Sequence, residues 1–315
     1  MVGNLFAFTG ILTGFSLLMV ASPMVGELIA TTSPLWMDYP GQYTNLKYEN
    51  VAFPTTDGLT LRGWFFPTDN ASNPVILYAP ATAKDQRQGI SLVEPLHNAG
   101  YQVLLFSYRG TGNSDGNRFM FSYGARESVD VDAAVRYLSE TRGLQKIGAI
   151  GHSAGAVSII LSAARNPKLD AIVVAAPFAT LDDVWDENRP SVIPTEVYSL
   201  GMKISELRKS FSRSEVRPLD VIAQIAPRPI LFINGTKDKR INRQQAIELY
   251  NAAGDPKQMI WIPGATHAEV RSPGLDDLMP SLIQFFDENL RDMPAGALKT
   301  AVNPLTMLPD IAVKN

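Results

Sequence analysis

The stretch "GAIGHSAGAV", residues 148–157, decides how this chain is expected to fold. An apolar run leads into it, Ser153 stands near its centre, and the helix-like segment "AGAVSIILSAA" follows Ser153 directly. With Gly151 and Gly155 the serine forms the pattern G-x-S-x-G, which is typical of a sharp strand-to-helix turn that exposes a serine hydroxyl. The residues two positions either side must be slim because the backbone at such a turn is strained. Ser153 is therefore a candidate nucleophile that still needs a base, an acid and oxyanion donors from elsewhere in the chain.

Short apolar runs alternate with helix-like segments on both sides of this turn. The apolar runs cover residues 74–80, 101–108, 146–153, 171–178, 229–235 and 258–264, and the helix-like segments lie near 87–99, 124–142, 154–165, 243–253 and 275–290. Such alternation predicts a parallel sheet buried on both faces, with functional side chains at the carboxyl ends of its strands. Upstream, "NLKYENVAF" and "LTLRGWFFP" flank "PTTDG" and predict an antiparallel hairpin. We therefore expect an α/β fold whose mostly parallel, twisted sheet of about eight strands is flanked by helices.

The composition argues against several kinds of function. The chain has 315 residues, no cysteine and a net charge of −3, so we expect no thiolate metal site, no cysteine nucleophile and no nucleic-acid partner. Its three histidines, His97, His152 and His267, are too few and too scattered to predict a histidine-rich metal site. We therefore expect neither a cofactor nor a metal, and each histidine can be judged individually as a base.

The base is expected to be His267. It lies in "PGATHAEV", after the last predicted strand and before the last predicted helix, and so at the carboxyl edge of the sheet. His97 falls within a helix ahead of the second core strand, where it caps the helix or lies on the surface. His152 adjoins Ser153 on the turn, where adjacent side chains point in different directions.

The acid that orients the base is expected to be Asp238. It follows "PILFINGTK" and so lies beyond the carboxyl end of a strand. Asp255 is the alternative, but it precedes its strand and therefore lies at the wrong end of the sheet. The resulting order along the chain, serine then aspartate then histidine, is the order that accompanies this kind of turn.

Two backbone amides are expected to hold an oxyanion. The first is that of Ala154, which opens the helix after the turn and points where negative charge would form. The second should come from the loop after the first core strand, "YAPATAKDQ". Ala81 is the candidate there because we expect its amide to be free and its side chain is small, whereas Pro80 has no amide hydrogen to donate.

Taken together, these segments resemble the α/β-hydrolase superfamily, and within it the Bem46-like group of membrane-anchored serine hydrolases. The resemblance covers about residues 46–291 and is carried by "DGLTLRGWFFP", "VLLFSYRGTGNSDG", "GHSAG", "RPILFINGTKD" and "GATHAEV". It implies that Ser153 is the nucleophile, Asp238 the acid and His267 the base. This chain departs from the group where Ala79 and Pro80 replace the usual His-Gly of the first oxyanion loop. Within "YRGTGNSDG", we expect Arg109 to have a structural role.

The first residues differ from the rest because no charged side chain occurs before Glu27. Residues 5–25 would span roughly 30 Å as a helix, so we expect residues 1–30 to be a transmembrane anchor. A signal peptide and a buried helix are the alternatives. Gly10 and Gly14 form a G-x-x-x-G pair that would allow weak self-association. The orientation in the membrane stays open, and we favour an extracytoplasmic catalytic domain.

The rest of the chain divides into a linker at 31–45, a hydrolase domain at 46–292 and an extended or disordered tail at 293–315. About fifty residues separate two of the strands, which predicts a small helical cap at about 182–226. One helix face there is apolar and should cover the sheet, and a second hypothesis has it line an acyl pocket: Val197, Leu200, Ile204, Leu207 and Phe211. The opposite, polar face carries Lys203, Glu206, Arg208 and Lys209.

The predicted function is that of a carboxylesterase-like serine hydrolase acting on a small-molecule acyl substrate. Thioesters and amides are related substrates, and a peptidase or an acyltransferase would use the same groups. A catalytically silent, membrane-anchored scaffold is the alternative from another class, and the Ala-Pro of the oxyanion loop favours it. The predicted triad argues against the scaffold. A haloalkane dehalogenase or an epoxide hydrolase would need a carboxylate in place of Ser153.

Overall fold

The structure is a computed structural model that describes residues 40–82 and 84–291. The expected anchor at 1–30, with its Gly10–Gly14 pair, and the tail at 293–315 lie outside the described residues, as does most of the linker. Within the described ranges, no helix has both the length and the apolar character needed to cross a membrane.

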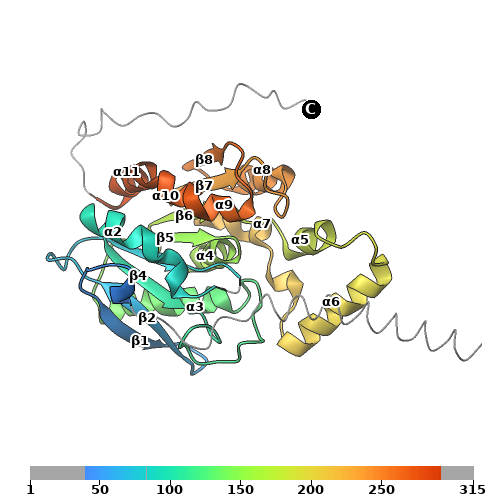
Figure 1. The fold of residues 1–315 in the computed structure, drawn as a ribbon, viewed down its shortest axis with the longest axis horizontal. Helices are drawn as coiled ribbons and strands as arrows, with labels where there is room; N and C mark the ends of the chain where they lie inside the picture. The colour runs from blue at the N-terminus through green and yellow to red at the C-terminus, as the bar shows by residue number, and fades with distance from the viewer. Residues whose placement is uncertain (1–39, 83, 292–315) are drawn as a thin grey trace, which may run out of the picture.

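One eight-stranded sheet runs through the centre of the molecule (Figure 1). Its spatial order is β1-β2-β4-β3-β5-β6-β7-β8. The first hairpin, β1 with β2, is antiparallel, β2 also pairs antiparallel with β4, and all later pairs are parallel. The strands are β1 (Glu49–Pro54), β2 (Thr60–Phe66), β3 (Val75–Ala79), β4 (Gln102–Ser107), β5 (Ile147–His152), β6 (Ala171–Ala175), β7 (Ile230–Gly235) and β8 (Lys257–Ile262). The expected α/β fold with a mostly parallel sheet is thus confirmed.

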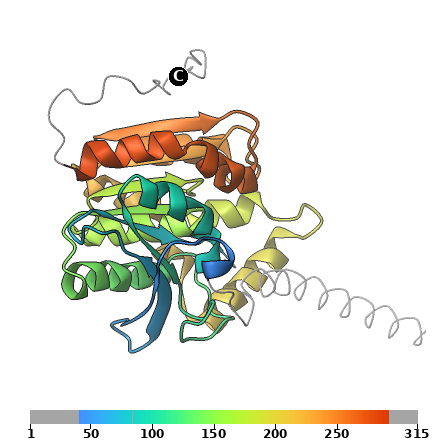
Figure 2. The same ribbon diagram turned by 60° about the vertical axis from the view of Figure 1, so that its left-hand side comes forward.

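Helices cover both faces of the sheet (Figures 1 and 2). The chain around the sheet contains η1 (Pro40–Gln42), η2 (Gln86–Gly89), α2 (Ile90–Asn98), α3 (Glu127–Arg136), η3 (Tyr137–Thr141), α4 (Ala154–Arg165), α8 (Arg243–Ala252), α9 (His267–Glu269), η6 (Val270–Gly274), α10 (Leu275–Asp277) and α11 (Met279–Leu290). Side chains from α3, α4 and α8 share one apolar cluster with the sheet, and side chains from α2 and α11 share another on the opposite face.

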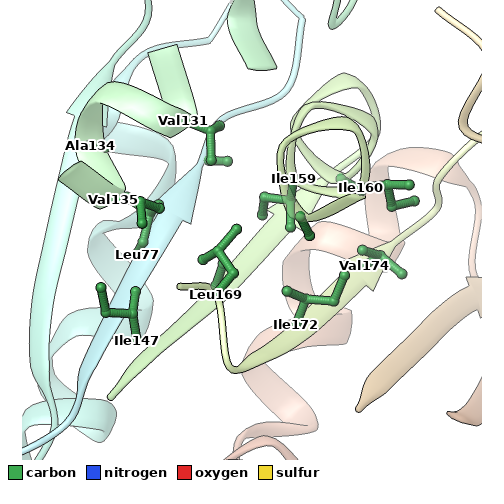
Figure 3. Packing of buried hydrophobic residues seen from close by; sticks show 14 of the residues in the cluster. Leu77, Val131, Ala134, Val135, Ile147, Ile159, Ile160, Leu169, Ile172 and Val174 are labelled. Atoms are coloured by element: carbon green, nitrogen blue, oxygen red, sulfur yellow. The ribbon is translucent and has the colours of Figure 1, made fainter. Parts of the chain in front are cut away.

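The strands β3 to β7 are apolar almost throughout because both of their faces are covered, whereas β1 and β8 at the two edges of the sheet are partly exposed. In β3, Leu77 joins the cluster with α3 and α4, whereas Ile76 and Tyr78 join the cluster on the other face. Figure 3 shows Val135 of α3 and Ile159 of α4 packed in the first of these clusters. Full burial of each such side chain contributes about 1.5–3 kcal/mol. This two-sided core holds the carboxyl ends of β3, β5, β7 and β8 at one common edge.

A helical insertion lies between β6 and β7. It contains α5 (Leu181–Glu187), α6 (Thr195–Lys209), η4 (Arg213–Glu215), α7 (Pro218–Val221) and η5 (Ile222–Ile225). In Figure 1, α6 lies beside the sheet and not over one of its faces. Trp185 of α5 and Phe211 after α6 belong to a third apolar cluster, which also takes in Val157 and Leu161 of α4.

The predicted covered face of α6 is confirmed for Phe211 and in part for Val197, which pack in the third cluster, and is wrong for two leucines. Leu200 and Leu207, placed on the covered face from the sequence, are 56% and 70% exposed. The buried residues of the helix itself are Tyr198 and Met202, which pack in the third cluster, Gly201, and the polar residues Ser205, Glu206 and Lys209. Burial of the two charged residues depends on specific partners, because Glu206 accepts a hydrogen bond of 2.7 Å from the amide of Arg213 and Lys209 lies 5.4 Å from the ring centroid of Tyr123.

Candidate active site

The backbone at Ser153 holds the side chain away from both the strand and the helix. Its φ is 55° and its ψ is −122°, which costs of order 1–3 kcal/mol for a residue with a side chain. Its amide donates to the carbonyl of Ala175 in β6 at 2.8 Å, so the strained residue is tied to the sheet. A Cβ at Gly151 would lie 2.6 Å from the carbonyl carbon of Gly155, and a Cβ at Gly155 would overlap the carbonyl oxygen of Ala79. Close backbone approach therefore explains both glycines of the pattern.

The structure brings Ser153, His267 and Asp238 together at the carboxyl edge. The Nε2 of His267 lies 3.0 Å from the hydroxyl oxygen of Ser153, and its Nδ1 lies 2.7 Å from Oδ2 of Asp238. A neutral imidazole that donates from Nδ1 to the carboxylate can accept the serine proton at Nε2. The alternative acid, Asp255, precedes β8 at the opposite end of the sheet, as expected.

Local structure fixes the two partners of the serine. Thr266 and Glu269 form a capping box that starts α9, so His267 is the first residue of a short helix. The side chain of Asp238 is almost fully buried, and its Oδ1 accepts from the amides of Arg240 at 2.8 Å and Ile241 at 3.0 Å. Burial alone would raise the pKa of Asp238, but the hydrogen bonds from His267 and these amides lower it below its usual value. The carboxylate therefore stays ionised beside the imidazole.

His152 has a position that the sequence did not reveal. It does not act on Ser153, but its Nε2 donates to the backbone carbonyl of His267 at 2.9 Å, and the two rings lie 5.0 Å apart. Burial, with a further contribution from the charge of His267, lowers the pKa of His152 to about 3. The ring is therefore neutral, and its Nδ1 is buried without a partner among the described residues. His152 thus helps to fix the backbone of His267, the expected base.

The two expected oxyanion donors differ in availability. Within the described residues, the amide of Ala154 has no hydrogen-bond acceptor, and it stands at the positive end of α4. The amide of Ala81, expected to be free, instead donates to Oε1 of Gln88 at 2.8 Å. Gln88 reaches it because η2 turns the chain back beneath the loop, and the carbonyl of Gln88 is itself held by Arg271. The expectation of a free amide at Ala81 is therefore wrong.

Two cavities of about 370 Å³ each adjoin Ser153. Both are lined by Thr82, Arg240 and His267 as well as the serine. The first, the apolar cavity, is further lined by Tyr123, Phe178, Val184, Trp185, Asn188 and Ile241. The second, the basic cavity, is further lined by Ala81, Lys84, Gln88, His152, Ala268 and Arg271. A third, of about 740 Å³, lies over the loop from Thr236 to Arg240.

The insertion reaches the apolar cavity through α5 and not through α6. Val184 and Trp185 of α5 line it, whereas none of the residues of the predicted α6 face does. The hypothesis that this face lines an acyl pocket is therefore wrong. Within the described residues, no three histidine, aspartate or glutamate side chains converge as metal ligands would.

Arg109, expected to be structural, lies in an ion-pair network. Its guanidinium binds Asp130 at 2.7 Å and Asp57 at 2.6 Å, and its amide donates to Asp130 at 2.9 Å. Asp130 is fully buried in α3, and Asp57 belongs to the turn between β1 and β2. Arg109 lines none of the three cavities.

The chain is similar to several known proteins. The sequence model of the prolyl oligopeptidase family (Peptidase_S9) matches residues 89–292. The uncharacterized protein Rv2307c of Mycobacterium tuberculosis is 30% identical over 69% of this chain and 72% of its own length. Protein bem46 of Schizosaccharomyces pombe is 27% identical over 80% of this chain and 81% of its own length. The Pyrococcus furiosus esterase Pf2001 has the same fold, with a TM-score of 0.67 at 21% identity, over 82% of this chain and 99% of its own.

Proposed function

Since the chain belongs to the prolyl oligopeptidase family and is a Bem46-like α/β hydrolase, we propose that it is a serine hydrolase of carboxylic esters. The observation that carries this proposal is the hydrogen-bonded line from Ser153 through His267 to Asp238. Its distances of 3.0 and 2.7 Å lie within the reach that a nucleophile, its base and an orienting acid require. The similarity of the fold to that of the esterase Pf2001 supports an ester substrate.

In the proposed reaction, the hydroxyl oxygen of Ser153 attacks the ester carbonyl while Nε2 of His267 takes its proton. Asp238 stabilises the imidazolium, and the amide of Ala154 donates to the oxyanion. The tetrahedral intermediate collapses, the C–O bond to the alcohol breaks, and His267 returns the proton to the leaving oxygen. A water molecule, deprotonated by His267, then attacks the acyl-serine. The bond between the acyl carbon and the oxygen of Ser153 breaks, His267 returns the proton to that oxygen, and the carboxylic acid is released.

The amide of Ala81, the second expected oxyanion donor, is occupied by Gln88, and this contact favours a second candidate function. Ala81 can donate to an oxyanion only if the side chain of Gln88 releases its amide. Loss of one such donor costs about 10²–10³ in kcat, so a permanently occupied amide would leave a slow enzyme. This contact favours a catalytically silent scaffold with the same fold, while the complete Ser153–His267–Asp238 line favours the hydrolase.

Labelling with a fluorophosphonate probe distinguishes these candidates. We expect the wild-type protein to be labelled, Ser153→Ala to be unlabelled, and Ser199→Ala, a change at an exposed serine of α6, to behave as wild type. A folded wild-type protein without label would favour the scaffold. Label on Ser153→Ala would overturn the assignment of the nucleophile.

A substrate panel then separates the hydrolase activities. It contains 4-nitrophenyl esters of increasing chain length, a 4-nitrophenyl thioester and a prolyl 4-nitroanilide, each with and without an added alcohol as acyl acceptor. We expect ester hydrolysis to be fastest. Faster cleavage of the anilide would instead support a peptidase, as the family name suggests, and transfer to the alcohol would support an acyltransferase.

Membrane anchoring is a further part of the proposal and rests on the sequence alone. The absence of charge before Glu27 supports an anchor at residues 1–30. The full chain should stay with the membrane fraction after alkaline carbonate extraction, and a chain that begins at residue 40 should be released. Release of both would contradict the anchor.

A further inference from the structure

We propose that the basic cavity selects ester substrates that carry a negative charge, a carboxylate or a phosphate, close to the scissile carbonyl. The inference rests on the proposed ester hydrolysis and names its substrate class. The residues that carry it are Arg240 and Lys84, with Lys237 and Lys239 nearby.

Two of the described residues line all three cavities around the site, the expected base His267 and Arg240. The backbone of Arg240 is fixed, because its amide donates to Asp238 at 2.8 Å and its carbonyl accepts from the side chain of Asn188 at 3.0 Å. Its side chain is exposed, and no carboxylate of the described residues forms an ion pair with it. The backbone of Arg240 is thus fixed beside Ser153, while its guanidinium is available to bind a ligand.

Other cations add to this charge. Lys84, in the loop after β3, lines the basic cavity, is exposed and likewise has no ion pair within the described chain. Lys237 and Lys239 line the adjoining third cavity. Arg271 also lines the basic cavity, but it is buried and bound to Asp276 at 3.2 Å, so its charge is largely balanced.

The carboxylates around these cavities are fewer than the cations. Among the described residues that line the three cavities, Asp238 is the only acid, and its two oxygens already accept from His267, Arg240 and Ile241. Glu269, which caps α9 through Thr266, lies near Lys237 and adds a second negative charge, so two carboxylates stand against the four cations Arg240, Lys84, Lys237 and Lys239. The local charge is therefore positive although the whole chain carries −3. A cleft of one sign concentrates oppositely charged ligands and raises their rate of association.

The apolar cavity defines the rest of the substrate. Tyr123, Phe178 and Trp185 line it, and it shares Ser153 with the basic cavity. A carbonyl held at Ser153 would therefore have an apolar group on one side and an anionic group on the other. A neutral ester would gain nothing from Arg240, whose charge would remain solvated.

Matched ester pairs test the proposal. Mono-4-nitrophenyl glutarate is compared with 4-nitrophenyl methyl glutarate, which places the charge on the acyl side. In the second pair, 4-butyryloxybenzoate is compared with its methyl ester, which places the charge on the leaving group. A further substrate, 4-butyryloxyphenyl phosphate, replaces that carboxylate by a phosphate. In at least one pair we expect kcat/KM to favour the anionic ester about tenfold, and less at 0.5 M salt.

Variants assign the preference to the cavity. Arg240→Gln and Lys84→Gln should each reduce the preference for the anionic ester, and Arg240→Glu should abolish or reverse it. Arg208→Gln removes the same charge from an exposed site on α6 and should leave it unchanged. Equal or faster hydrolysis of the neutral ester in both pairs would overturn the proposal, as would a preference that survives both glutamine variants.

A binding measurement separates this proposal from the hydrolase itself. On Ser153→Ala, 4-phenylbutyrate is titrated against 4-phenylbutyramide, with tryptophan fluorescence as the signal because Trp185 lines the apolar cavity. We expect the carboxylate to bind about tenfold more tightly and Arg240→Gln to remove the difference. Equal binding of the two ligands contradicts the charge preference. Absence of probe labelling and of all ester cleavage contradicts the hydrolase, whatever the binding result.

Discussion

Two side chains next to the candidate nucleophile affect the site through the backbone. His152 binds the carbonyl of His267, and Gln88 occupies the amide of Ala81. The sequence predicted Ser153, Asp238 and His267 because each follows a strand that periodicity reveals. It did not predict the contacts of His152 and Gln88, because hydrophobic pattern carries no information on which polar side chain meets which backbone group. Gln88 lies within the 3-10 helix η2, and no sequence pattern indicates that its side chain turns back to the amide of Ala81.

His152 should act as a positioning residue. His152→Ala leaves the carbonyl of His267 without its donor, so we expect kcat to fall about tenfold with little change in KM. His152→Gln restores a donor and should recover most of kcat. An equal loss of activity in both variants, with unchanged Tm, would contradict the positioning role.

The same residue makes stability depend on pH. The pKa of His152 is about 3 in the folded protein, against an ordinary value of 6.5. Because the unfolded chain takes up this proton first, the stability that His152 contributes is complete above pH 6.5 and is lost as pH falls towards 3. Urea midpoints measured from pH 7 down to pH 4 should fall more steeply for wild type than for His152→Gln. Parallel curves for the two proteins would contradict this assignment.

Gln88 should restrain the reaction. Gln88→Ala frees the amide of Ala81 for an oxyanion, and we expect kcat to rise by up to about tenfold. Gln145→Ala, at an exposed glutamine far along the chain, should leave kcat unchanged. If Gln88→Ala lowers kcat at an unaltered Tm, the glutamine assists the reaction and does not compete with it.

At the scale of the elements, the sheet could be predicted more completely than the insertion. Each of the six predicted core strands lies within a few residues of its apolar run, and five of them, β3 to β7, are apolar because they are buried on both faces. The sixth, β8, is a partly exposed edge strand. For α6 the same apolar-polar reasoning was right for Phe211 and in part for Val197, but wrong for two leucines and for part of the polar face. Glu206 and Lys209 are buried by partners outside the helix, and Leu200 and Leu207 are left exposed. Periodicity predicts a helix, but tertiary contacts decide which face is covered.

The observed orientation of α6 predicts that two substitutions lower the free energy of unfolding by different amounts. Met202→Ala removes a buried side chain and should lower the free energy of unfolding by about 2–5 kcal/mol. Leu207→Gln changes an exposed residue and should stay within about 0.5 kcal/mol of wild type. Chemical denaturation measures both. A larger loss for Leu207→Gln than for Met202→Ala would restore the orientation predicted from the sequence.

Across the whole molecule, Arg109 joins parts that are far apart in the chain. It follows β4, pairs with buried Asp130 in α3, and reaches Asp57 in the turn of the first hairpin. One guanidinium thus connects the antiparallel edge of the sheet with α3, which covers one face of the sheet.

Removal of that guanidinium should be costly. Arg109→Met leaves the carboxylate of Asp130 buried without its partner, and we expect a loss of about 3–5 kcal/mol in unfolding free energy. The double variant Arg109→Met with Asp130→Leu should recover much of this loss, since Asp130 is then no longer buried without its partner. A double variant no more stable than the single one would show that the cost is not due to the uncompensated carboxylate.

In the sequence, the insertion between β6 and β7 separates Ser153 from the other two residues of the candidate site. Ser153 and the strands β1 to β6 precede it, and Asp238 and His267 follow it. Val192, between α5 and α6, is 74% exposed, so a protease can reach the backbone there. A single cut would yield two fragments that each hold part of the reactive group and are joined by the pairing of β6 with β7. Recovery of activity on mixing the fragments would therefore report their reassembly, as in a split-enzyme sensor.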